Sequence, residues 1–573
     1  MVLFAFTSSS SKLKHSHKSF SESLMEDNIK DAEAIIHQWI PPELLDSSSF
    51  CCISSLFSTG NREEARRFIG AVNSLHSGMV TLVSVNPSSM KLVRAENLMK
   101  ISMNHLSKEF YRILKSNRRY LDPESVSVRS RVSTKSVSDE DAMADLKMIA
   151  DCMTTSGYGK ECFRIYKKIR KSMIVEALDR LGFENLSFSQ IQKLDWEVME
   201  KKIRNWLRAA RRALTTLFSG ERILSDHVFS SSAAIRRESA FAEITLESAL
   251  AMFSFPGNMA KCRKSPEKIF LTLDVYQSIT ELLPEIEKVF SYDSTSSVLS
   301  QIAVTLTDLG DGVISMLDEF ESSISKESSK SLISGGGIHQ LTRYVMNFIV
   351  FLADFSDTLS TIIPRTSLSH FPEENSSSGS GDVNSSSSPL EKRIAWLILF
   401  LLCKIDAKSR LYSDVALSYL FLINNLNYVV VKVRTSSLKE ILSSDWLEKH
   451  EGKVKKYVAK FEEIVWGEMM TSLPTAEEEA EEFLSRFSDR FEEAYKRQTG
   501  WVVTDPKLRD EIKVSVAMVI IPTYSEFYKK YRVGLRKNVG FAPGDIGNYL
   551  SDLYFGSGGS GTFSSIHSSD SYV

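Results

Sequence analysis

Proline and glycine are scarce in this sequence, with 14 prolines and 26 glycines among 573 residues. Both residue types interrupt or weaken helices, so their scarcity leaves room for long uninterrupted ones. No stretch of alternating apolar and polar residues is bounded by hairpin turns, so nothing indicates a β-sheet. The sequence therefore predicts an all-α protein.

The six cysteines lack the spacing of a metal site. No two of them form a C-x-x-C pair, and no histidine pair stands beside them at zinc-ligand spacing. In a chain of this length we expect reduced, buried thiols in an intracellular compartment and no structural metal. The cysteines are Cys51, Cys52, Cys152, Cys162, Cys262 and Cys403.

Long apolar runs are also missing. The two longest are IAWLILFLLC (394–403) and FIVFLA (348–353), and both fall well short of the roughly 18–20 residues that span a bilayer. The N-terminal stretch MVLFAFTSSSSKLKHSHKSF holds no arginine and too few apolar residues for a signal peptide. We expect both runs to be buried helices of a soluble protein.

Motifs of catalysis and nucleotide binding are absent. The sequence contains no P-loop, no H-E-x-x-H and no G-x-S-x-G, and the tail GSGGSG (556–561) follows no strand. His450 stands among charges in EKHEGK and is expected to be exposed, and residues 335–337 (GGG) are expected to form a flexible loop rather than a phosphate cradle. The sequence predicts a protein that is not an enzyme and uses no cofactor or small-molecule substrate.

Helical periodicity is the dominant pattern. In two long segments, 191–218 and 453–470, apolar residues recur at three- and four-residue steps and form one stripe along a helix. Thr475 and Glu478 form a capping-box pattern ahead of a further helix. The stripes are Met199, Ile203, Trp206, Leu207, Ala210, Leu214 and Leu217, and Val454, Val458, Phe461, Val465 and Met469.

Composition divides the chain into folded and unfolded parts. Residues 372–389 (PEENSSSGSGDVNSSSSP) are rich in serine and glycine and predict a disordered insertion. Ser133 follows RSRV in a linker and is a candidate phosphorylation site. In chain order we expect a disordered N-terminus (1–25), an N-terminal helical segment (26–124), the linker (125–140), a helical body (141–555) that contains the insertion, and a disordered tail (556–573).

Charge is nearly balanced overall but not locally. The 70 Lys and Arg against 72 Asp and Glu give a net charge of −2, which argues against a general nucleic-acid binder. Between Tyr495 and Gly540, however, ten Lys and Arg stand against four Asp and Glu. The densest part is YKKYRVGLRKN (528–538), which holds five basic residues and no acid.

This basic segment predicts a two-sided helix. We expect Pro522 to end the apolar helix before it, and Thr523 with Glu526 to begin a new one. In a helix from Tyr524 to about Lys537, the five basic residues fall within an arc of roughly 160°. They are Lys529, Lys530, Arg532, Arg536 and Lys537, and the other side carries Tyr524, Phe527, Tyr528, Tyr531 and Leu535.

Two interpretations of the basic side remain open. One is an ordinary solvated helix face, since cations near a helix C-terminus are favoured by the dipole. The other is contact with an anionic surface, because a cytoplasmic leaflet contributes about 1 kcal/mol for each nearby Lys or Arg. Nucleic acid is disfavoured because the aromatic residues are expected to face the core and none is available for stacking.

Many segments in order resemble the family of exocyst subunits known as Exo70, in its plant-type form. They include KSRLYSDVALSYLFLINNLNYVVVKVR, DWLEKHEGKVKKYVAKFEEIVWGEMMTSLP, FEEAYKRQTGWVVTDPKLRDEIKVSVAMVIIPTYSEFYKKYR and VGFAPGDIGNYLSDLYFG. Upstream, SPEKIFLTLDVYQSITELLPEIE and GGGIHQLTRYVMNFIVFL are also similar. The resemblance covers residues 140–555, with weaker similarity back to residue 26.

The resemblance implies an elongated rod of consecutive antiparallel helical bundles that tethers secretory vesicles in exocytosis. It implies other exocyst subunits and small GTPases as partners, and a cytoplasmic protein recruited peripherally to the plasma membrane. The implied ligand is phosphatidylinositol 4,5-bisphosphate, bound through Lys529, Lys530, Arg532, Arg536 and Lys537, with Lys507, Arg509 and Lys513 as further candidates. The alternative is a soluble helical adaptor for defence or autophagy-related traffic without strong membrane binding.

Overall fold

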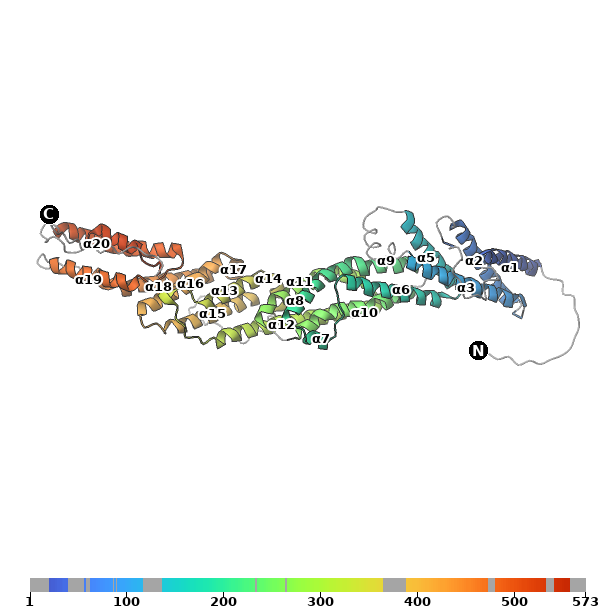
Figure 1. Cartoon of the computed structure of the whole chain (residues 1–573), viewed down its shortest axis with the longest axis horizontal. Coiled ribbons are helices and arrows are strands. Elements are labelled where there is room, and N and C mark those ends of the chain that lie inside the picture. Colours follow the sequence, from blue (N-terminus) through green and yellow to red (C-terminus); the bar gives the residue numbers. More distant parts are fainter. Residues whose placement is uncertain are drawn as a thin grey trace, which may run out of the picture. The chain divides into compact units, whose positions relative to one another are not determined.

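The structure is a computed structural model, and nearly all the residues that it describes lie in helices (Figure 1). Within them, β-type pairing is limited to one antiparallel bridge between Val502 and Phe555. The predicted all-α fold class is confirmed. The described residues are 20–39, 56–57, 62–85, 87–88, 90–116, 137–231, 234–262, 265–363, 388–471, 480–531 and 541–556.

Several predicted features fall on residues outside these described ranges. Ser133, the capping pair Thr475 and Glu478, most of the insertion 372–389 and the tail beyond Gly556 lie outside the described residues. The predicted linker 125–140 is described from Val137 on, where a helix begins. The domain limits predicted from composition stay predictions.

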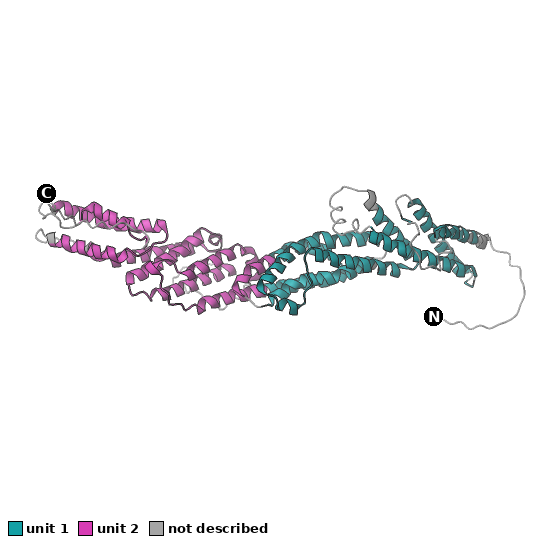
Figure 2. Cartoon of the chain, in the orientation of Figure 1, with its two compact units in different colours: residues 1–262, 277–309 teal, residues 263–276, 310–573 magenta. Residues whose placement is uncertain are grey.

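The chain divides into two compact units (Figure 2). One comprises residues 1–262 and 277–309, and the other comprises residues 263–276 and 310–573. The division falls inside α11 (Ile269–Val289) and α12 (Ser296–Lys326), so both helices contribute residues to both units.

The first unit consists of helices that pack on their sequence neighbours and on α6, which contacts α3, α5 and α10. Besides parts of α11 and α12, its helices are α1 (Phe20–Trp39), α2 (Arg62–Val85), α3 (Met90–Ser116), α5 (Val137–Thr155), α6 (Gly159–Arg180), α7 (Phe188–Gln192), α8 (Trp196–Arg212), α9 (Ser219–Val228) and α10 (Ala234–Ala260).

The first predicted apolar stripe lies along α8 and into the segment after it. Met199, Ile203 and Trp206 are at most 4% exposed, and the indole of Trp206 donates to the carbonyl of Met252 at 2.9 Å. Of the seven predicted residues, Leu207 alone is half-buried. The chain then forms a π-helical turn, Ala213–Phe218, before α9 begins.

A fully buried ion pair joins α6 to α9. The guanidinium of Arg170 donates to Oε2 of Glu221 from Nε at 2.8 Å and from Nη2 at 2.6 Å, and both side chains are 0% exposed. Tyr166 donates its hydroxyl to the other carboxylate oxygen at 3.0 Å. Burial, together with the carboxylate, raises the pKa of Tyr166 well above its usual value, so its hydroxyl stays a donor.

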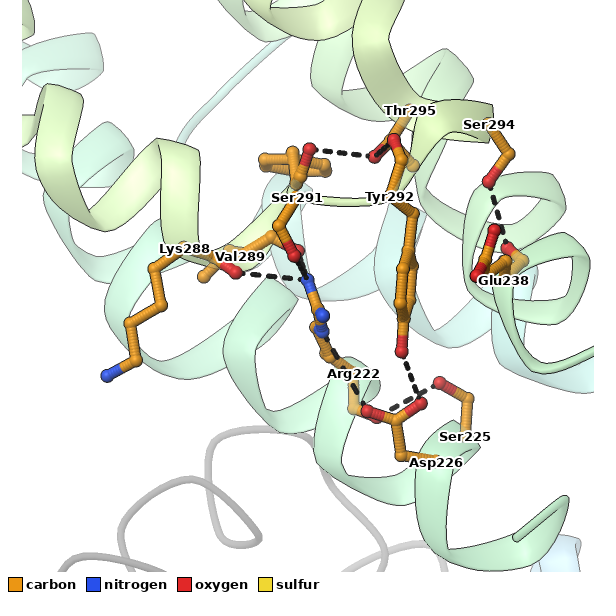
Figure 3. A network of polar contacts seen from close by, with 11 residues as sticks. Arg222, Ser225, Asp226, Glu238, Lys288, Val289, Ser291, Tyr292, Ser294 and Thr295 are labelled. Atoms are coloured by element: carbon orange, nitrogen blue, oxygen red, sulfur yellow. Dashed lines mark hydrogen bonds and ion pairs between the residues drawn. The ribbon is translucent and has the colours of Figure 1, made fainter. Parts of the chain in front are cut away.

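Arg222 connects α9 to the C-terminal end of α11 (Figure 3). Its Nη1 donates to the main-chain carbonyls of Lys288, at 3.0 Å, and Val289. These carbonyls lack partners within the helix, and a cation is favoured there. The guanidinium also lies 3.9 Å from the ring centre of Tyr292, whose hydroxyl donates to Asp226 at 2.6 Å. The turn from α11 to α12 is thus fixed to α9 by side-chain contacts.

Breaking the Arg170–Glu221 pair should destabilise the first unit. In Glu221→Gln the guanidinium of Arg170 keeps its charge but loses the carboxylate of Glu221, which costs about 3–5 kcal/mol for a buried pair. We expect faster amide exchange in α6 and α9, measured by hydrogen-exchange mass spectrometry. The double variant Arg170→Met/Glu221→Leu removes both charges and should recover most of the protection. Unchanged exchange in Glu221→Gln would contradict this account.

The described residues of the second unit form two apolar cores, and α16 contributes buried residues to both. Phe421, Val429 and Val433 of α16 lie in the first core, and Leu420 and Val430 lie in the second. Besides parts of α11 and α12, its helices are α13 (Gln340–Ala353), α14 (Ser356–Ile362), α15 (Pro389–Ser409), α16 (Val415–Arg434), α17 (Leu438–Ile441), α18 (Ser444–Thr471), α19 (Ala480–Gln498), α20 (Pro506–Tyr531) and α21 (Pro543–Ser551).

By length and composition alone, α2 and α16 are long and apolar enough to cross a membrane. The segment Ser334–Ala353, which contains α13, passes the same test only together with α14, and the two helices are bent by 85° relative to each other. Of the two apolar runs singled out in the sequence, the run 394–403 lies in α15, which is not one of these candidates. The run 348–353 lies in α13. For α16 the composition has another explanation. A helix that is buried on two sides has apolar residues around most of its circumference.

The segment 335–337, expected to be a flexible loop, is instead enclosed by α16 and by residues 500–502. Gly335 has a φ of +68°, and a Cβ atom there would lie 2.5 Å from the carbonyl oxygen of Gly500. The carbonyl of Gly335 accepts from the amide of Val502 at 2.8 Å. Glycine is required because the backbones approach too closely for a side chain. The expected flexible loop is therefore wrong.

Two adjacent amides of α16, Asn424 and Asn425, fix this segment. Asn424 donates to the carbonyls of Gly336 and Val502 at 2.8 and 2.7 Å. Asn425 is 0% exposed and accepts from the amide of His339 at 2.9 Å and from the hydroxyl of Thr342 at 2.7 Å. The start of α13 and the segment before α20 are thereby hydrogen-bonded to the same turn of α16.

Asn425→Ala should destabilise this junction by about 2–4 kcal/mol, because several buried donors and acceptors lose their partner. We expect faster amide exchange at the start of α13 and in the middle of α16. The matched control is Asn427→Ala, two residues further along α16 at a half-buried position, which should leave the exchange rates nearly unchanged. Equal effects of the two variants would contradict the assigned role of Asn425.

Candidate functional site

The helix that carries the predicted basic segment, α20, passes through Pro522 without ending. Thr523 donates its hydroxyl to the carbonyl of Val519 at 3.1 Å, a bond typical of a residue inside a helix and not of an N-cap. The predicted break and the predicted capping box of Thr523 and Glu526 are therefore wrong. The packing of α20 along its whole length outweighs the hydrogen bond that a proline removes.

The aromatic side of this segment docks on the second core, as predicted. Tyr524 is 1% exposed, its ring stacks on Phe487 with 4.5 Å between centroids, and its hydroxyl donates to the carbonyl of Phe541 at 2.8 Å. Phe527 meets Phe483 edge to face at 4.8 Å, and Tyr528 is half-buried against the same core. The side chain of Tyr531 and all of Leu535 lie outside the described residues.

The basic side is described only in its first part. Lys529 and Lys530 are exposed on the last turn of α20. Arg532, Arg536 and Lys537 lie outside the described residues. The aromatic anchors next to Lys529 and Lys530 hold this end of the helix on the body of the second unit, so these two charges are presented from a packed element.

The three further candidates differ in what they offer a ligand. Lys507 is 83% exposed and only loosely paired with Glu511, at 3.9 Å. Arg509 and Lys513 instead lie 4.2 and 4.1 Å from the ring centre of Phe555. Lys513 also donates to the carbonyl of Ser551, and burial lowers its pKa. Arg509 and Lys513 thus hold the segment after α21 against α20, and Lys507 alone of the three presents its charge to solvent.

A trough of about 670 Å³ lies between α16, α18 and α20. Apolar residues such as Val454, Val458 and Ile512 line it, and its rim carries charges of both signs. Glu462 is in its wall, where it accepts from the hydroxyl of Ser515 at 3.0 Å through one carboxylate oxygen. The other oxygen is buried without a hydrogen-bond partner among the described residues, and burial raises the pKa of this carboxyl.

Sequence reasoning missed Glu462. It stands directly after Phe461 of the second predicted stripe and four residues after Val458, so the same periodicity places it at the edge of the buried face. Of the five stripe residues, Val454, Phe461 and Met469 are buried and Val458 and Val465 are half-buried.

His450 was expected to be exposed, and this is wrong. The residue is 8% exposed, its ring stacks on Trp446 with 3.8 Å between centroids, and Nδ1 lies 2.7 Å from the carbonyl oxygen of the same tryptophan. The charges around it in the sequence occupy other faces of α18. His450 is a packing residue.

The expected burial of the thiols holds for two of the four described cysteines. Cys152 and Cys162 are buried, and burial raises the pKa of Cys152 to about 12. Cys262 is half-buried, and Cys403 is exposed on α15, so for these two the prediction of buried thiols is wrong. Among the described residues, no group of three or more His, Cys, Asp or Glu is placed to hold a metal ion.

Two family models match this chain. The model for the C-terminal part of the Exo70 exocyst complex subunit matches residues 204–552. The model for the N-terminal part of the exocyst complex component Exo70 matches residues 28–116. Together they include α20 with Lys507, Lys513 and the predicted basic residues, the part of α1 from residue 28 on, α2 and α3.

Several plant proteins are similar in sequence. Exocyst complex component EXO70B1 of Arabidopsis thaliana is 34% identical over 400 residues, which are 68% of this chain and 61% of that protein. EXO70A1 of the same plant is 29% identical, over 71% of this chain and 66% of that protein. EXO70C1 is 25% identical over 90% of this chain and 86% of that protein. The chain thus matches less than two thirds of the length of the first two relatives.

A solved structure of Saccharomyces cerevisiae Exo70 shares the fold. It matches with a TM-score of 0.59 and 15% identity, over 94% of this chain and 99% of that one. At this identity the likeness shows the fold alone, and it agrees with the predicted all-α class.

Burial of Glu462 predicts a pH-dependent effect of Glu462→Gln. Since its pKa is raised in the folded state, the ionised carboxylate weakens the fold at pH 7, and this cost is absent below the unfolded pKa of about 4.3. We expect the variant to raise the urea midpoint at pH 7 and to have little effect at pH 4. The control is Glu463→Gln at the exposed neighbouring position. Equal midpoint changes for Glu462→Gln at both pH values would contradict this assignment.

Proposed function

Because the chain belongs to the Exo70 family of exocyst subunits, in its plant-type form, we propose that it tethers secretory vesicles and contacts an anionic membrane through the end of α20. The lipid that the proposal names is phosphatidylinositol 4,5-bisphosphate at the plasma membrane. The residues proposed to bind it are Lys529, Lys530, Arg532, Arg536 and Lys537, with Lys507 as a further contact.

The observation that carries this proposal is the exposed pair Lys529 and Lys530 beside aromatic anchors that pack on the second core. Tyr524 and Phe527 immobilise the last two turns of α20 against the second core. A cation on a packed helix loses little side-chain and backbone freedom on binding, compared with one on a loose tail. The chain then continues with three more basic residues in the next seven.

The binding energy of such a site is mainly electrostatic. Each Lys or Arg near the anionic leaflet contributes about 1 kcal/mol, and the attraction decays over about 8 Å at physiological ionic strength. Five such residues are sufficient for reversible recruitment, and the binding should weaken steeply with added salt. Under this proposal no residue acts as a catalyst.

The proposal extends to partners and location. Other exocyst subunits are the proposed partners in tethering, and small GTPases are proposed regulators. The protein is proposed to be cytoplasmic and to move peripherally to the plasma membrane when it binds lipid.

A second candidate function is a soluble helical adaptor for defence or autophagy-related traffic. The observation that favours it is the presence of acids on the exposed side of α20, where Asp510, Glu511 and Glu526 are all exposed. They reduce the positive potential of the helix away from its last turn, and a mixed surface suits a protein partner.

Liposome co-sedimentation with and without phosphatidylinositol 4,5-bisphosphate tests the proposal. Lys529→Ala/Lys530→Ala should weaken lipid-dependent binding about thirtyfold, since two contributions of about 1 kcal/mol are lost. The variant with all five basic residues changed to Ala should abolish it. The charge-matched control is Lys453→Ala/Lys456→Ala, at two exposed positions of α18, and should bind like the unmodified chain.

Equal losses in the two double variants would mean that only net charge matters and would contradict a localised site. Absence of lipid-dependent binding by the unmodified chain would favour the adaptor function.

A further inference from the structure

A straight seam of exposed side chains runs along α20. Its members recur at four- and three-residue steps, so on a helical projection they fall within an arc of about 80°. All are exposed except the half-buried Ser525. The seam comprises Lys507, Glu511, Val514, Met518, Pro522, Ser525 and Lys529.

The centre of the seam is apolar. Met518 is 72% exposed and Val514 is 51% exposed, and the neighbouring Val519 is 46% exposed. Pro522, also exposed, follows Met518 by one turn. Exposed apolar side chains that follow one another on the same face of a helix, one turn apart, are typical of a surface that packs against a second helix.

The residues of the seam that stand on the two sides of its apolar centre, Glu511 and Lys529, carry opposite charges. Glu511 lies before the apolar centre, with a side chain that is 59% exposed, and Lys529 lies after it. A uniformly anionic surface would attract Lys529 but repel Glu511 and its exposed neighbour Asp510. The partner that fits both Glu511 and Lys529 is a helix that carries these charges in the opposite order, and the same helix turned end to end does so.

We propose that a second copy of this chain docks antiparallel on this seam of α20. In the register that is symmetric about residue 520, Glu511 of each copy faces Lys529 of the other, and Met518 faces Pro522. Shifting the axis to residue 518 would place Lys507 against Lys529, and like charges across an interface are unfavourable. The charges therefore select one register, and the two helix dipoles oppose each other favourably in it.

The contact is short and fits a reversible dimer. The seam from Glu511 to Lys529 extends about 27 Å at 1.5 Å per residue. Interfaces of one helix pair are at the small end of specific protein contacts, which is typical of transient association. The inference goes beyond the proposed function and does not depend on it, since the seam forms without lipid. Lys529 belongs to both surfaces, so dimer and membrane would compete for it.

Sedimentation velocity of the purified full chain, from about 1 to 100 µM at low salt and without lipid, tests this proposal. We expect a concentration-dependent dimer. Met518→Glu, which places a carboxylate against the apolar Pro522 of the other copy, should raise the dissociation constant at least tenfold. The matched control is Met90→Glu on α3, an 82% exposed methionine of the first unit, and it should leave the dissociation constant unchanged.

Charge reversal tests the register. Glu511→Lys and Lys529→Glu should each weaken the dimer by about tenfold, because each creates two like-charged contacts. The double variant Glu511→Lys/Lys529→Glu restores opposite charges and should return the dissociation constant to within about threefold of the original. A monomer at every concentration, a dimer that survives Met518→Glu, or a double variant that fails to recover would each overturn the proposal.

Discussion

The hydrogen bonds of Asn424 and Asn425 are the constraint on which the second unit depends. Both amides are on one turn of α16, and the two apolar cores of the unit lie on either side of this helix. Asn425 holds the start of α13, and Asn424 holds the segment that leads into α20. If these amides lost their partners, the two cores would keep their apolar contacts but would lose their alignment along α16.

This constraint also governs the candidate site. The amide of Thr504, two residues before α20, donates to Asn424 at 3.0 Å, and the amide of Val503 donates to the carbonyl of Tyr554 at 3.1 Å. The start of α20 and the segment after α21 are therefore fixed at the same place. Lys529 is at the other end of α20. The packing of Tyr524 and Phe527 on the second core fixes which face of that end, with Lys529, is exposed to solvent.

Much of the fold was predictable from the sequence because helices are specified by local periodicity. The stripes around Trp206 and Phe461 fall on buried faces, and the aromatic side of the segment after Pro522 packs as expected. The candidate site was predictable in the same sense, since placing Tyr524 and Phe527 inward turns Lys529 outward. These predictions need only the geometry of one helix.

The errors share a physical cause, which is tertiary contact. A proline such as Pro522 is expected to end a helix that has no tertiary contacts, but α20 is packed on both sides of Pro522 and continues through it. The charges flanking His450 suggested exposure, but its ring faces Trp446. The glycines at 335–337 suggested flexibility, but the φ values and close backbone approaches there show that they are required by a packed turn. Glu462 was missed because nothing in the neighbouring sequence shows that an acidic residue next to an apolar stripe is buried.

The burial of α16 on two sides has a consequence for how the protein is made. Partners for one side of this helix, α13 and α15, precede it in the chain, but α18, α19 and α20 follow it. During synthesis, a 20-residue helix apolar enough to resemble a membrane span therefore leaves the ribosome with half of its partners still missing. Until α18, α19 and α20 have all been synthesised, the native cover of that side is incomplete, and chaperones have a binding surface there.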